Sequence, residues 1–204
     1  MSRVIFLHGV GSSGAAMRPL AAALGLSGGT HFPDGPQPFD MGPGRQWFSV
    51  RGVTEENRPA RIRAALPAFR ATVESLGDPR DSILIGFSQG AIMALHAVAD
   101  GLPAKAVLAL SGRLAGPVAA RADWPPITLL HGDSDGVMPP ALARATAGWL
   151  QDAGATPSLT VLDGLGQLQQ TGLGDGQRVG DRTEDAAPQA DSRAEGVAHG
   201  VPGS

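Results

Sequence analysis

The sequence predicts an α/β fold in which a mostly parallel sheet is covered by helices on both faces. Short apolar runs, typical of strands, alternate along the chain with longer runs of helical character. The strand-like runs are almost continuously apolar, as expected for strands buried on both faces of a sheet. A chain of 204 residues suits one domain with a substantial core, with room for a tail.

The expected strands and helices largely alternate along the chain. The predicted strands are 3–7, 82–85, 105–110, 126–130 and 157–162, and the predicted helices are 15–24, 54–76, 91–99 and 140–153. Thr54 is the expected N-cap of the second helix, with acidic residues in its first turn. Pro67 lies inside that helix and is expected to kink or split it.

Composition excludes several classes of function. The net charge of −3 gives no electrostatic reason to expect nucleic acid or an anionic membrane as a partner. The chain has no cysteine, which excludes disulfides, thiolate metal sites and a cysteine nucleophile. No apolar run is long enough to span a membrane, and the N-terminus does not resemble a signal peptide, so we expect a cytoplasmic protein.

The segment Gly86-Phe87-Ser88-Gln89-Gly90 carries the strongest chemical signal. Gly-x-Ser-x-Gly between a strand and a helix is the nucleophile elbow of α/β-hydrolases, in which a tight turn exposes the serine above the sheet. In a glycine-rich chain the pentapeptide alone is weak, and the bland alternative is a plain strand-to-helix turn. Here the required strand and helix are both present, which favours Ser88 as a nucleophile.

The loop after the first strand, His8 to Gly14, allows two interpretations. Gly9, Gly11 and Gly14 fit the dinucleotide-binding pattern, with Asp34 where a ribose-binding acid is wanted. The same residues read as His-Gly-x-Gly, a loop that supplies a backbone N–H to an oxyanion hole. The serine downstream favours the second interpretation, in which His8 orders the loop and does not act as a base.

The segment 32–53 is rich in proline and contains four of the nine aromatic residues. A long loop of this composition is expected either to form a wall over the active site or to be fastened to the sheet edge by its aromatics. Further on, Asp133 and Asp135 follow the fourth predicted strand, where an α/β-hydrolase carries the acid of its triad. Spacing alone does not decide which of the two is the triad acid.

Together these segments resemble one family, the phospholipase/carboxylesterase group of α/β-hydrolases, which includes acyl-protein thioesterases. The matching segments are 6–11, 32–36, 46–48, 86–90, 110–112 and 131–139. The resemblance implies Ser88 as nucleophile and Asp135 as the triad acid. It also implies the backbone N–H groups of Val10 and Gln89 as the oxyanion hole, and Trp47 and Phe48 at the substrate pocket. It implies no cofactor and no metal.

The resemblance breaks where the family has its catalytic histidine. After the last predicted strand comes the expected glycine-rich loop, but Gln167 stands at the histidine position. An amide takes up no proton near neutral pH and cannot be a general base. Residues 167–204 also lack the family's closing amphipathic helix and have the composition of a disordered tail.

Three explanations of this break are open. The first is that the reading frame changes near codon 167, so that the histidine is encoded in another frame. The second is that the protein is genuine and catalytically weakened. The third is that His199 folds back to serve as the base. The sequence therefore predicts a hydrolase domain at 1–166 and a tail at 167–204. The expected function is hydrolysis of a small carboxylic ester or thioester through an acyl-enzyme, inactivated if the histidine is lost. The alternative is a non-catalytic domain of the same fold that binds an apolar ligand or partner. The sequence does not define the oligomeric state.

Overall fold

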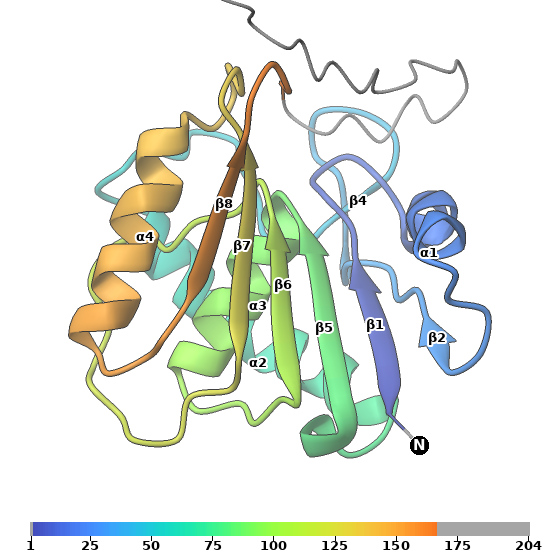
Figure 1. Cartoon of the computed structure of the whole chain (residues 1–204). Coiled ribbons are helices and arrows are strands. Elements are labelled where there is room, and N and C mark those ends of the chain that lie inside the picture. The colour runs from blue at the N-terminus through green and yellow to red at the C-terminus, as the bar shows by residue number, and fades with distance from the viewer. Residues whose placement is uncertain (1, 167–204) are drawn as a thin grey trace, which may run out of the picture. The chain divides into compact units, whose positions relative to one another are not determined.

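The computed structural model describes residues 2–166 of the chain. Its centre is a six-stranded sheet in the order β2-β1-β5-β6-β7-β8, with every neighbouring pair parallel (Figure 1). The strands are β1 (Arg3–Leu7), β2 (Thr30–His31), β5 (Ser82–Phe87), β6 (Ala106–Leu110), β7 (Ile127–Gly132) and β8 (Ser158–Leu162). The predicted parallel α/β sheet is confirmed.

The register of the sheet gathers the functional loops. Leu7 of β1 lies opposite Gly86 of β5, and Phe87 lies opposite Leu110 of β6. The loops that follow these strands therefore leave the sheet at nearly the same level, at the end where the arrowheads lie in Figure 1. Ligands of open α/β sheets bind at the carboxyl ends of the strands, and the site is built there.

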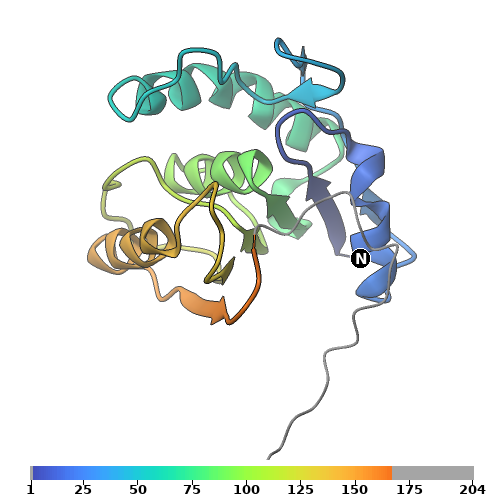
Figure 2. The ribbon, with the colours of Figure 1, turned by 90° about the horizontal axis from the view of Figure 1, so that it is seen from above.

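The helices are unevenly shared between the two faces of the sheet. They are η1 (Gly14–Met17), α1 (Arg18–Ala23), α2 (Arg58–Ser75), η2 (Pro79–Asp81), α3 (Gln89–Ala99) and α4 (Pro140–Asp152). Figure 2 shows α2, α3 and α4 on one side of the sheet. On that side the larger core cluster joins alternate strand residues such as Leu84 and Val107 to Phe69 and Met93 of the helices.

The opposite face is covered over only part of its width. Phe6 and Ile85 pack there against Met17 and Ala21 of η1 and α1. Over β6–β8 no helix within residues 2–166 covers this face, and Leu108 and Leu130 stay half-buried. The expectation of helices on both faces is therefore met in full only around β1 and β5. The predicted tail lies outside the described residues.

Two local expectations about the second helix need correction. α2 is continuous from Arg58 to Ser75 with Pro67 inside it, so the proline does not split the helix. Ile62 and Phe69, on either side of Pro67, are both about 1% exposed, and their burial stabilises the helix across the proline. The N-cap is Asn57, not Thr54. Thr54 starts the preceding turn, where its Oγ1 accepts the backbone N–H of Asn57 at 3.3 Å.

The proline-rich segment is fastened to the body of the domain, although it contains little regular structure. Its only pair of strands within the described chain, β3 (Gln37–Pro38) and β4 (Arg45–Gln46), forms a short antiparallel hairpin. Arg45 exchanges backbone hydrogen bonds with the loop after β1, donating to Ser12 at 2.7 Å and accepting from Gly11 at 2.9 Å. The hairpin thus supports the loop that was expected to form an oxyanion hole.

Candidate active site

Ser88 lies in the tight turn between β5 and α3. Its backbone has φ 49° and ψ −113°, a conformation that residues other than glycine rarely adopt. The turn is fixed by two backbone hydrogen bonds, from the Ser88 N–H to Leu110 at 2.9 Å and from Ile92 to the Ser88 carbonyl at 3.0 Å. Strain of this kind is stored at functional sites and costs of order 1–3 kcal/mol.

The two glycines of the elbow are required by close packing. A Cβ added to Gly86 would lie 2.5 Å from the backbone nitrogen of Ala91, at the start of α3. One added to Gly90 would lie 2.5 Å from the carbonyl carbon of Leu7 and 2.8 Å from the carbonyl oxygen of His8. Real side chains do not tolerate such distances. The elbow and the end of β1 can approach this closely only because neither position has a side chain.

Val10 and Gln89 lie on the same cleft as Ser88. Gln89 is the first residue of α3, so its N–H has no carbonyl four residues earlier in the helix to bond. Val10 follows β1 in the loop supported by the hairpin. Two backbone N–H groups beside a serine at a helix N-terminus suit a developing oxyanion.

Both ring nitrogens of His8 are hydrogen-bonded to backbone groups, and its ring lies against that of Trp47. Its Nε2 accepts the N–H of Gly35 at 2.8 Å, and its Nδ1 donates to the carbonyl of Gly9 at 2.7 Å. The side chain is fully buried, and this burial lowers the pKa of His8 below its ordinary value. A neutral imidazole with both nitrogens engaged orders the loop, as the sequence predicted. Asp34 accepts the N–H of Gly14 at 2.7 Å and so also serves the loop.

Trp47 and Phe48 have different surroundings. Phe48 lines the cleft beside Ser88. Trp47 does not line it: its ring packs against Phe69 in the core, and its indole N–H donates to the carbonyl of His8 at 2.9 Å. The structure therefore assigns Trp47 to support of the His8 loop, because a buried indole satisfies its N–H by binding a backbone carbonyl.

The side chain of Gln89 has a role that the sequence analysis missed. Its Oε1 accepts the N–H of Trp47 at 2.8 Å, and its Nε2 donates to the carbonyl of Phe48 at 2.7 Å. The buried amide thus connects the elbow to the proline-rich segment and holds Phe48 over the cleft. The sequence contains both the glutamine after the serine and the Trp-Phe dipeptide. They lie about forty residues apart, so the sequence does not indicate that they are in contact.

The cleft beside Ser88 has a volume of about 260 Å³ and is apolar on one side and charged on the other. Its apolar lining is Val10, Phe48, Val50, Ile92, Val137, Met138 and Leu142, and its charged lining is Glu55, Arg58 and Arg113. Wider hollows lie elsewhere, one of about 490 Å³ beside His96 and one of about 380 Å³ beside Trp124. Neither contains Ser88, so the smaller cleft is the candidate active site.

Of the two candidate acids, Asp135 is the buried one, at 3% exposure, while Asp133 is exposed. Its Oδ1 accepts two backbone N–H groups, from Val137 at 3.0 Å and from Met138 at 2.8 Å. Its Oδ2 is buried and makes no hydrogen bond to any described residue. A carboxylate fixed through one oxygen, with the other available, is suited to hold an imidazole.

None of the four histidines within residues 2–166 lines the cleft. His131 is the nearest to Asp135, with 3.5 Å between Nε2 and Oδ2. That Nε2 donates to the carbonyl of Met138 at 2.6 Å, so it carries a proton and fixes the acid loop. His96 accepts the N–H of Ala115 through Nε2 at 3.0 Å. His31 belongs to the edge strand β2.

The loop after β8 brings the chain next to the acid loop. The N–H of Ser134 donates to the carbonyl of Leu165 at 3.0 Å, and a Cβ on Gly132 would lie 2.6 Å from the carbonyl oxygen of Gly166. Leu165 and Gly166, the last residues that the structure describes, therefore lie beside the loop of Asp135. Gln167 and His199 both lie outside the described residues.

No group of three or more histidine, aspartate or glutamate side chains within residues 2–166 is arranged to hold a metal ion. No helix in the same range is long and apolar enough to cross a membrane.

A parallel sheet, a strained serine between strand and helix, and an acid two strands later define an α/β-hydrolase. Residues 2–171 match the model of the phospholipase/carboxylesterase family, and the chain belongs to this family. It is 37% identical over 176 residues to esterase YpfH of Escherichia coli (strain K12), covering 80% of this chain and 74% of that protein.

Solved structures agree with this assignment. The crystal structure of esterase PE8 matches with a TM-score of 0.70 and 32% identity, covering 81% of this chain and 84% of that one. Acyl-protein thioesterase 2 of Zea mays matches with a TM-score of 0.64 and 23% identity, covering 82% and 87%. At that identity the second match supports the fold alone. The chain is thus a hydrolase of the carboxylesterase type by family.

Proposed function

We propose that this chain derives from a cytoplasmic serine esterase that cleaves small carboxylic esters or thioesters through an acyl-enzyme. Ser88 would attack the carbonyl carbon, while the N–H groups of Val10 and Gln89 stabilise the oxyanion. The alcohol or thiol leaves, and water then releases the acid from Ser88. The strained backbone of Ser88 at the floor of a partly apolar cleft carries this proposal.

The missing part is the general base. Asp135 would orient an imidazole and stabilise the imidazolium, but it activates Ser88 only through that imidazole. No histidine of the described chain reaches the cleft, and Gln167 occupies the family's histidine position. We therefore propose that the chain as written is catalytically weakened. A non-catalytic domain that binds an apolar ligand is the second candidate, favoured by this same absence.

Turnover of p-nitrophenyl butyrate tests the proposal. A serine hydrolase without its base loses roughly 10⁶ in turnover and keeps roughly 10³–10⁴ over water. We expect hydrolysis barely above background, within a few-fold of that of Ser88→Ala. Robust turnover that Ser88→Ala abolishes would show that a base is present, and His199→Ala would then test whether His199 supplies it.

A further inference from the structure

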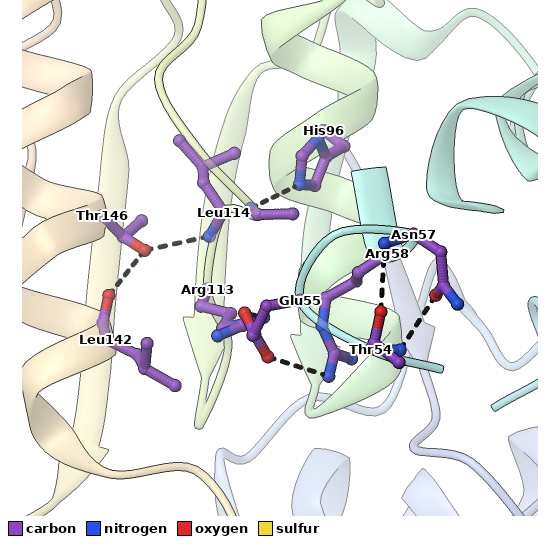
Figure 3. A network of polar contacts seen from close by, with 10 residues as sticks. Thr54, Glu55, Asn57, Arg58, His96, Arg113, Leu114, Leu142 and Thr146 are labelled. Carbon is purple, nitrogen blue, oxygen red and sulfur yellow. Dashed lines mark hydrogen bonds and ion pairs between the residues drawn. The ribbon is translucent and has the colours of Figure 1, made fainter. Parts of the chain in front are cut away.

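The charged wall of the cleft consists of two arginines and one glutamate. Arg113, in the loop after β6, donates to Glu55 at 2.5 Å, and Arg58, at the start of α2, donates to the same carboxylate at 3.2 Å. Figure 3 shows Glu55 with both arginines beside it. Guanidinium groups stay protonated, so this wall carries a net positive charge.

Glu55 compensates this charge incompletely. The Arg113 side chain is 6% exposed, whereas the Glu55 side chain is 65% exposed and screened by water. In the described chain, Glu55 is the one carboxylate that pairs with Arg113. The Nε of Arg58 is also buried and has no hydrogen-bond partner among the described residues. A buried cation with an exposed partner still favours a further anion.

The backbone behind Arg113 is rigidly mounted. The next residue, Leu114, donates its N–H to Oγ1 of Thr146 on α4 at 2.9 Å. Ala115 donates its N–H to Nε2 of His96 on α3 at 3.0 Å. Both bonds involve helix side chains, and Thr146 is fully buried. The backbone that carries the Arg113 side chain is therefore fixed before a ligand binds, which reduces the entropy lost on binding.

We propose that Arg113, assisted by Arg58, is a subsite for a carboxylate, and that the cleft prefers esters with a free carboxylate on the acyl or alcohol part. Monoesters of short dicarboxylic acids are the substrate class that this predicts. The ester group would lie at Ser88, the carbon chain along the apolar side, and the carboxylate at the guanidinium groups, which match its two oxygens. A volume of about 260 Å³ favours a short chain. This inference rests on the proposed function of the same cleft.

Equilibrium binding tests the subsite without any need for turnover. Monomethyl glutarate and its neutral counterpart methyl valerate are titrated into the full chain, and backbone NMR shifts are followed. We expect the anionic ester to bind about 10- to 100-fold more tightly, as for one or two charge-assisted hydrogen bonds. The preference should weaken as salt is raised.

Variants separate recognition from a structural ion pair. Arg113→Gln should abolish the preference, and Glu55→Gln should strengthen anion binding several-fold because it removes a competing carboxylate. Arg63→Gln, at an exposed position of α2 outside the cleft, is the matched control and should change nothing. If the ion pair were purely structural, Glu55→Gln would not increase the affinity for the anionic ester.

Equal affinity of the wild-type chain for the two esters would overturn the subsite, and so would an unchanged preference in folded Arg113→Gln. If instead the hydrolase proposal is wrong, the anionic ester still binds more tightly, and only the turnover measurements differ from those expected.

Discussion

The elbow's glycines give the sharpest test of the packing beneath Ser88. A Cβ at position 90 would overlap the carbonyl group of Leu7 and approach the carbonyl oxygen of His8 to 2.8 Å. Both atoms belong to the backbone, so neither can turn away as a side chain would. Overpacking of this kind costs about 1–3 kcal/mol when the surroundings can adjust. We expect Gly90→Ala to lower the free energy of unfolding by at least the upper end of this range.

Urea unfolding followed by circular dichroism measures the change. The matched control is Gly148→Ala on α4, where an added Cβ meets no atom within 4 Å. There the substitution should stabilise the chain by about 0.5–1 kcal/mol, because alanine favours a helix interior over glycine. A Gly90→Ala variant as stable as the wild type would refute the packing described for the elbow.

Two further predictions concern buried polar groups. Burial, and then the nearby Arg113 charge, lower the pKa of His96 to about 4 from 6.5. The unfolded chain therefore binds a proton first as pH falls from 6.5 to 4, and stability declines by up to about 3 kcal/mol. His96→Gln keeps an acceptor for Ala115, so urea unfolding at pH 7 and 4 should show a smaller decline; an equal decline would contradict the assignment. Trp47→Phe leaves the His8 carbonyl unpaired and should lower the free energy of unfolding by about 1–3 kcal/mol, whereas an unchanged urea midpoint would show that the bond is unimportant.

Local patterns explain why most of the fold could be predicted. Five of the six strands in the central sheet are short apolar runs, whereas the edge strand β2, with only Thr30 and His31, was not predicted. The elbow's requirements are contained within five residues, so Ser88 and its flanking elements needed no tertiary information. The acid loop required more. Two aspartates fit by spacing, and only the family resemblance favoured Asp135 at the level of sequence. In the structure, burial and two N–H donors distinguish Asp135 from the exposed Asp133.

The features that could not be predicted depend on contacts between distant segments. An aromatic residue in an irregular loop can face a cleft or the core, and Trp47 faces the core because the His8 carbonyl accepts its N–H. The ion pair between Glu55 and Arg113 joins residues 58 positions apart. Pro67 was expected to kink or split a helix, and packing on both of its sides keeps that helix from splitting.

Restoring the imidazole tests the central claim most directly, namely that Ser88 and Asp135 form an esterase site that lacks only its base. Gln167→His puts an imidazole at the position where the family has its histidine, directly after Gly166 in the sequence. We predict that turnover of p-nitrophenyl butyrate rises by at least about 10²-fold. The gain should disappear in Ser88→Ala and should be largely lost in Asp135→Asn, because no carboxylate then orients the imidazole. No gain in a folded Gln167→His variant, or a gain that persists without Ser88, would contradict the account.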